Sequence, residues 1–129
     1  HYMPAPELGG DMWGTYTLPD GRVALYCADF SGHGVASAIN TFRLHVLLSG
    51  LNLIISPSPS AVLEYLNAEL QPTLPRGQYL AIFYAIIDRT NGTLQYASAS
   101  MPDALLLSGQ QITRLKGAGL PIGVARSAT

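Results

Sequence analysis

The feature that most constrains this chain is a short loop, Pro19-Asp20-Gly21, between two stretches suited to β-strands. These stretches, residues 12–18 and 23–30, contain the aromatic and β-branched side chains that favour a pleated surface. Pro19 suits the first central position of a type I turn, and Gly21 suits the left-handed position that follows. The sequence therefore predicts a β-hairpin closed by a three-residue loop.

The length of this loop decides which residues face each other across the hairpin. A three-residue loop places Asp11 opposite Asp29, whereas a two-residue Asp20-Gly21 loop sets Asp11 against Phe30. We favour the three-residue loop because it gives the proline and the glycine their preferred positions. Directly opposed Cβ atoms lie about 4.5–5.5 Å apart, where like charges are destabilising. Facing carboxylates therefore suggest a hard divalent cation such as Mg²⁺ or Mn²⁺, and the alternative is two unrelated, solvated aspartates.

A glycine-rich turn follows Asp29 and leads directly into a helical pattern. Its residues are Ser31, Gly32, His33 and Gly34. Glycines let the backbone approach a ligand closely, and the start of a helix offers unpaired N–H groups to an anion. A metal pair beside such a turn suits phosphoryl chemistry.

Other readings of these motifs have less support. The third glycine of a dinucleotide-binding loop would fall at Ser37, and a hairpin supplies the strand. The sequence contains no Gly-Lys-Ser/Thr motif and no Gly-x-Ser-x-Gly motif. The three histidines lack the spacing of a zinc site.

Composition narrows the class of protein further. The chain has 129 residues, 48% hydrophobic content and a net charge of −1, so we expect one folded domain without a basic surface for nucleic acid. Residues 35–55 are apolar but interrupted by polar side chains, so we expect no membrane span. Cys27 is the single cysteine, which is compatible with a reducing cytosol and a cytoplasmic protein. We expect this thiol to be buried within its strand.

The remaining segments predict an α+β fold. Residues 35–50 read as a helix in which Arg43 is solvated. Its apolar stripe is predicted to hold Val35, Ala38, Ile39, Phe42, Val46 and Ser49, and to be widened by Leu44, Leu47 and Leu48. Ser58 and Pro59 suit the N-cap and first residue of a second helix. Residues 79–88 and 93–99 predict a strand pair, and residues 105–108 and 111–115 predict another. The apolar run within residues 81–87 indicates a strand that is covered on both faces.

These motifs together resemble the PPM (phosphatase 2C-like) serine/threonine phosphatases, most of all the bacterial branch with the sporulation stage II E and sigma-regulator phosphatases. The quoted matches are Glu7-Leu8-Gly9-Gly10-Asp11, Asp20-Gly21-Arg22 and Ala28-Asp29-Phe30-Ser31-Gly32-His33-Gly34. The resemblance implies a layered sandwich of two antiparallel β-sheets flanked by α-helices. Residues 1–129 would then form a partial phosphatase domain, incomplete at both ends.

The resemblance also implies a site and its partners. Asp11 and Asp29 would hold two Mn²⁺ or Mg²⁺ ions together with the backbone carbonyl of Phe30, and the turn formed by residues 31–34 would lie on the phosphate side. A metal-activated water would hydrolyse phosphoserine or phosphothreonine. The implied partners are a small phosphorylated protein of the anti-sigma-factor antagonist type and an upstream receiver or sensory domain, and a homodimer is also open.

Two hypotheses about activity follow from what this sequence contains. The family places further metal-binding aspartates in C-terminal motifs, and residues 1–129 include neither motif. Asp20, Asp88 and Asp103 are poor substitutes because they lie at or near turns. The chain is therefore interpreted as an inactive part of an active phosphatase, or as a pseudophosphatase that serves as a binding or dimerisation module.

Overall fold

The computed structural model describes residues 11–32, 35–51, 58–117 and 119–124. These residues form two strands, two helices and four further strands. In chain order the elements are β1 (Asp11–Thr17), β2 (Val23–Phe30), α1 (Val35–Leu51), α2 (Pro59–Leu70), β3 (Leu80–Asp88), β4 (Thr93–Ala99), β5 (Ala104–Ser108) and β6 (Gln111–Leu115).

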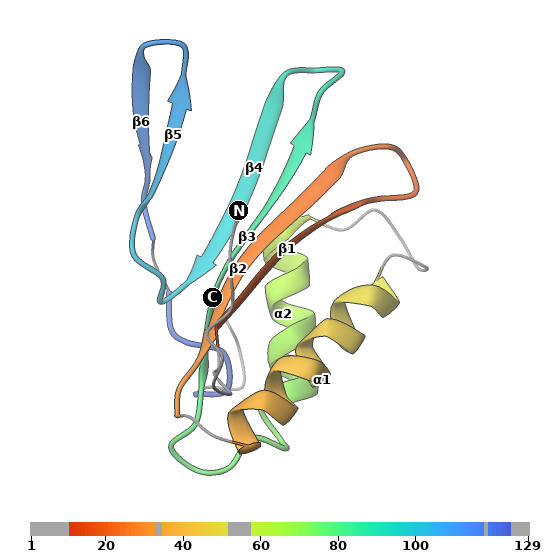
Figure 1. The fold of residues 1–129 in the computed structure, drawn as a ribbon, viewed down its shortest axis with the longest axis vertical. Coiled ribbons are helices and arrows are strands. Elements are labelled where there is room, and N and C mark those ends of the chain that lie inside the picture. The colour runs from red at the N-terminus through yellow and green to blue at the C-terminus, as the bar shows by residue number, and fades with distance from the viewer. Residues whose placement is uncertain (1–10, 33–34, 52–57, 118, 125–129) are drawn as a thin grey trace.

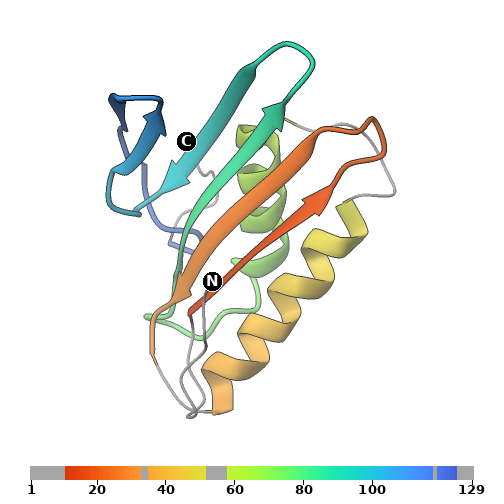
Figure 2. The same ribbon diagram turned by 45° about the horizontal axis from the view of Figure 1, so that its top comes forward.

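The strands form two antiparallel sheets. The larger sheet has the order β1-β2-β3-β4, and β5 pairs with β6 in a separate two-stranded sheet. Both helices cover one face of the larger sheet, and the β5–β6 hairpin stands beyond β4 on the side away from them (Figures 1 and 2). The predicted α+β arrangement of antiparallel sheets with flanking helices is confirmed.

The core lies between the larger sheet and the two helices. Alternate residues of β2 point into it, so Ala24, Tyr26, Ala28 and Phe30 are buried while Asp29 is exposed. The central strand β3 is buried at almost every position from Leu80 to Ile86. The prediction of a strand that is covered on both faces is confirmed.

The outer face of β2 differs from what the sequence predicted. Cys27 is exposed, so the expectation of a buried thiol was wrong. The physical reason is the alternation of the strand, which directs Cys27 to the face opposite the helices. A strand composition rich in apolar residues does not reveal which of its two faces is packed.

The buried face of α1 covers only the part of the predicted stripe that holds Leu44 and Leu48. Ile39, Phe42 and Val46 are exposed at 61%, 59% and 54%, whereas Leu44 and Leu48 are at most 2% exposed. Apolar residues surround most of this helix, so periodicity alone could not choose the face. Packing against the sheet and α2 makes that choice.

Arg43 is also placed differently from its prediction. It is half-buried, and its guanidinium donates to Thr73 Oγ1 and, at 2.9 Å, to the carbonyl oxygen of Glu69. Because it satisfies a backbone carbonyl at the end of α2, Arg43 joins α1 to that helix end. The expected solvated arginine is therefore an interhelical contact.

The second helix follows its sequence signals. Ser58 is the N-cap, and its hydroxyl accepts from Ala61 N–H at 3.2 Å, while Pro59 is the first helical residue. Val62, Leu66 and Leu70 are fully buried on the face toward the sheet. Among the residues that the structure describes, no helix has the length and apolar character to cross a membrane.

Candidate active site

The β1–β2 hairpin has the predicted three-residue loop. Leu18 N–H donates to Arg22 O at 2.8 Å, Gly21 N–H donates to Leu18 O at 2.9 Å, and Gly21 has a φ of 90°. Counting outward from this loop, the register pairs Asp11 with Asp29. The register that turn chemistry predicted is confirmed.

Asp29 lies near the end of β2, on the exposed outer face of the sheet. Its backbone is flanked on both sides, because β2 pairs Asp29 with Asp11 on β1 and with Ala81 on β3. The next residue, Phe30, is 2% exposed and anchors the end of the strand in the core. The strand end that carries the candidate ligands is therefore held in a sheet and not on a free loop. The structure describes the backbone position of Asp11 but not its side chain.

Hydrogen bonds extend the pairing beyond Phe30 into the turn. Ser31 N–H donates to Tyr79 O at 2.9 Å, and Tyr79 N–H donates to Ser31 Oγ at 2.9 Å. Gly32 follows with a φ of 93°, a conformation that favours glycine. Ser31 and Gly32 thus begin a sharply turning segment directly after Asp29 and Phe30. His33 and Gly34, which the sequence assigned to the phosphate side, lie outside the described residues.

A distant segment of the chain reaches the same end of the sheet. Ile122 and Leu80 exchange two backbone hydrogen bonds of 2.8 and 2.9 Å. Gly123 N–H donates to the side-chain oxygen of Asn67 at 2.8 Å. The sequence predicted the helix that carries Asn67 but not this contact with Gly123.

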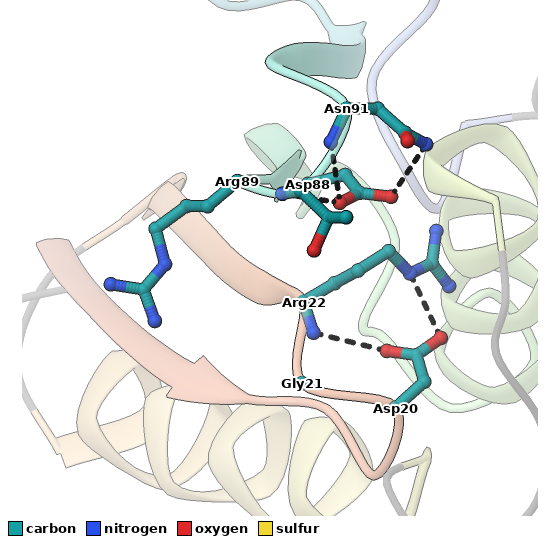
Figure 3. A pocket seen from close by; sticks show the side chains of 7 residues that line it. Asp20, Gly21, Arg22, Asp88, Arg89 and Asn91 are labelled. Atoms are coloured by element: carbon teal, nitrogen blue, oxygen red, sulfur yellow. Dashed lines mark hydrogen bonds and ion pairs between the residues drawn. The ribbon is translucent and has the colours of Figure 1, made fainter.

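The other aspartates of the described residues have local structural roles. Asp20 accepts from Arg22 N–H at 3.1 Å and from its Nε at 2.9 Å, while Asp88 accepts from the backbone of Thr90 and from both nitrogens of Asn91. Both groups line an open hollow of about 680 Å³, and Figure 3 shows their side chains around it. The hollow lies between the β1–β2 and β3–β4 loops, at the opposite end of the sheet from Asp29.

Asp103 is engaged in the same way, because it accepts from Gly117 N–H at 2.7 Å. Among the described residues no group of three or more His, Cys, Asp or Glu side chains could hold a metal ion. The donors expected at the Asp29 end are carboxylates and a peptide carbonyl, which are the hard oxygen ligands that Mg²⁺ and Mn²⁺ take. The residues at this end therefore fit such ions in chemical type and supply part of a ligand set.

Known proteins resemble this chain in sequence. The sequence profile of the family described as stage II sporulation protein E (SpoIIE) matches residues 19–129. The chain is 29% identical over 109 residues to the phosphoserine phosphatase RsbP of Bacillus subtilis, which covers 81% of this chain and 27% of that protein.

Two solved structures have a similar fold. One contains the PP2C phosphatase domain and a fragment of the regulatory domain of SpoIIE from Bacillus subtilis. Its TM-score is 0.76 at 18% sequence identity, and the match covers 95% of this chain and 36% of the SpoIIE chain. The other is the SiaA-PP2C domain of Pseudomonas aeruginosa, with a TM-score of 0.75, 26% identity, and coverage of 92% and 48%. The chain thus spans less than half the length of each of these relatives.

Proposed function

Because the chain belongs to the stage II sporulation protein E (SpoIIE) family, we propose that it is part of a metal-dependent protein serine/threonine phosphatase in a bacterial signalling protein. The observation that carries this proposal is the register that opposes Asp11 and Asp29 at the open end of the hairpin. Opposed carboxylates repel each other unless a cation lies between them. A site for divalent cations gives this arrangement a physical reason.

Asp11, Asp29 and the backbone carbonyl of Phe30 would hold Mn²⁺ or Mg²⁺ in this proposal. A bound pair of these ions lowers the pKa of water and offsets the negative charge of a transferring phosphoryl group. The protein contributes rigidity, since Asp29 is flanked by β1 and β3 and Phe30 is buried in the core. Ligands held by a sheet keep their positions better than ligands on a loop.

We assign the phosphate side of the site to residues 31–34, which the sequence predicts to form a glycine-rich turn. Ser31 has its N–H and its hydroxyl engaged with Tyr79, so it holds the start of the turn in place. Direct contact with phosphate then falls to Gly32, His33 and Gly34. Phosphate contact by the residues after Ser31 is reasonable because they precede the N-terminus of a helix, where free N–H groups favour anions.

The substrate in this proposal is phosphoserine or phosphothreonine on a small regulatory protein of the anti-sigma-factor antagonist type. This part of the proposal rests on family membership and on the similarity to the phosphoserine phosphatase RsbP. The proposal also includes an upstream receiver or sensory domain in the same protein. It further includes a homodimer and a cytoplasmic location. The partial coverage of the relatives agrees with a chain that is one portion of a larger phosphatase domain.

A second candidate function is a pseudophosphatase that binds partners without hydrolysis. The specific observation in its favour is that the described residues contain no cluster of three or more potential metal-ligating side chains. The two candidates differ in whether the complete protein turns over a phosphate ester in Mn²⁺.

The experiment that tests the proposal is the substitution Asp29→Asn in the complete protein. Loss of one strong electrostatic stabiliser should lower the Mn²⁺-dependent rate by at least about 100-fold. Asp88→Asn is the matched control, because Asp88 closes a turn at the other end of the sheet and should keep a near-normal rate. A near-normal rate for Asp29→Asn at saturating Mn²⁺ would remove Asp29 from the site.

A further inference from the structure

Asn67 is a polar side chain in the core of the protein. It lies on the buried face of α2 and is 1% exposed. Its side-chain oxygen accepts from Gly123 N–H at 2.8 Å, across 56 residues of sequence. Burying an amide costs free energy unless its hydrogen bonds are satisfied. Burial of Asn67 therefore favours the structure in which Gly123 N–H lies against its side-chain oxygen.

A continuous series of hydrogen bonds leads from Asn67 to the strand end that carries Asp29. Gly123 follows Ile122, which exchanges backbone hydrogen bonds of 2.8 and 2.9 Å with Leu80. Leu80 is the register partner of Phe30, and the preceding Tyr79 exchanges hydrogen bonds with Ser31. Helix α2 is therefore connected through residues 122–123 and 79–80 to residues 30–31.

The position of the segment at Gly123 requires a glycine. Gly123 has a φ of 98°, which side chains other than glycine rarely adopt, and an added Cβ would lie 2.7 Å from Leu74 Cδ1. The segment is thus confined between Leu74, Leu80 and the Asn67 side chain. A change at Asn67 must shift this segment or leave its N–H unsatisfied.

We propose that Asn67 is a positioning residue that, through Gly123, Ile122 and Leu80, holds the Asp29–Phe30 strand end in its metal-binding geometry. The inference rests on the proposed function, since it assigns the metal ions to that strand end. Asn67 does not contact the ions or the substrate; it acts through the backbone of residues 122–123. Residues that orient metal ligands from outside the coordination sphere typically change metal affinity by about 10- to 100-fold.

The test compares three variants in the complete protein. Asn67→Leu keeps the branched shape of the side chain but has no acceptor, and Asn67→Asp keeps an acceptor oxygen. Val62→Ala removes buried methyl groups from the same helix without touching the hydrogen-bond series. The first readout is the Kd for Mn²⁺ by titration calorimetry. The second is hydrogen exchange at the amides of Gly123 and Leu80.

Asn67→Leu should raise the Kd for Mn²⁺ by about 10-fold or more and should lose protection at Gly123. Asn67→Asp should keep Gly123 protected, and Val62→Ala should leave the Kd within about twofold of wild type because it only weakens core packing. If Asn67→Leu does not fold, Asn67→Ser takes its place, because its shorter hydroxyl withdraws the acceptor from Gly123.

The inference is overturned by a Kd for Asn67→Leu within twofold of wild type, or by an equal rise in Val62→Ala. It is also overturned if the wild-type protein binds no Mn²⁺. A wild-type protein that binds Mn²⁺ without hydrolysing a phosphate ester would overturn the proposed enzymatic function alone. In that case, comparing the Kd for Mn²⁺ of Asn67→Leu with that of the wild type would still test the role of Asn67.

Discussion

Gly14 lies on β1 opposite Tyr26 of β2, and the tyrosine ring occupies the space that a side chain would need. A Cβ at this position would be 2.8 Å from Tyr26 Oη and 3.0 Å from Cε1 and Cζ. Tyr26 is itself buried, so it cannot move aside without disturbing its neighbours. We expect Gly14→Ala to lower the free energy of unfolding by about 1–3 kcal/mol, the usual cost of overpacking, as measured by urea denaturation.

Gly50→Ala provides the matched control for this prediction. Gly50 lies in α1, and a Cβ there would meet no heavy atom within 4 Å. Since alanine favours a helix over glycine, the substitution should raise the free energy of unfolding by up to about 1 kcal/mol. A neutral Gly14→Ala variant would show that the ring of Tyr26 does not restrict β1.

Tyr16 and Tyr84 share a hydrogen bond between their hydroxyl groups on the helix side of the sheet. Burial, and then this hydrogen bond, raise the pKa of Tyr16 above its ordinary value. A folded-state pKa raised above the unfolded value near 10 contributes stability that is present below about pH 10 and is lost as the pH rises further. We therefore expect the free energy of unfolding to fall in that alkaline range.

Burial also raises the pKa values of Tyr26 and Tyr84. Tyr16→Phe should make this alkaline decrease shallower, because it removes one of these three groups with a raised pKa. Tyr96→Phe is the control, since Tyr96 stacks on Phe83 on the outer face of the sheet, away from this pair. Denaturant titrations at several pH values between 8 and 11 would compare the three proteins. Equal slopes for Tyr16→Phe and wild type would contradict the assignment to Tyr16.

The β1–β2 hairpin, as an element, brings Asp11 and Asp29 together through its loop geometry. Without metal, Asp11→Asn should stabilise the domain at pH 7 by about 0.5–1 kcal/mol, because it removes a like-charge pair across two strands. In Mn²⁺ the order should reverse, since the wild-type protein gains more free energy from binding the ion. Thermal melts with chelator and with Mn²⁺ would measure both effects.

Asp88→Asn should shift the melting temperature equally in chelator and in Mn²⁺, because Asp88 lies at the far end of the sheet. An Asp11→Asn protein that is neutral or less stable than wild type in chelator would show that the two carboxylates do not repel. The hairpin would then give no reason for a cation at this position.

The whole molecule leaves a broad apolar surface on the outer side of its larger sheet. An apolar groove of about 620 Å³ lies between this face and the β5–β6 hairpin, and Trp13, Leu105 and Leu107 are 43%, 68% and 68% exposed. Such a surface is typical of a face that packs against further structure. The described residues thus pack helices on one face of the larger sheet and leave apolar side chains such as Trp13 exposed on the other face, although β3 itself is buried.

We expect the complete protein to hydrolyse a generic phosphate ester in Mn²⁺, whereas residues 1–129 alone should remain near the uncatalysed rate. The reason is that, in the proposed site, this chain would supply two aspartates and one carbonyl, whereas a divalent cation takes about six oxygen ligands. The measurement compares both proteins at equal concentration and saturating Mn²⁺. Comparable turnover by the shorter chain would show that its own residues complete the site.

Local chemistry within a few residues determined much of this fold from the sequence alone. The loop Pro19-Asp20-Gly21 set the register of the hairpin, and Ser58 with Pro59 set the start of α2. These features depend on turn geometry and capping, which involve neighbours along the chain. The pairing of Asp11 with Asp29 was predictable for that reason.

Tertiary packing decided the features that depend on distant neighbours. The face of α1 that is buried, the exposure of Cys27 and the contact between Arg43 and α2 each depend on what lies across the core. The hydrogen bond from Gly123 to Asn67 joins positions far apart in the sequence. The sequence alone does not identify the hydrogen-bond partner of a polar residue in an apolar stripe. The partner depends on which side chains are buried and which distant groups lie within hydrogen-bonding distance in the folded chain.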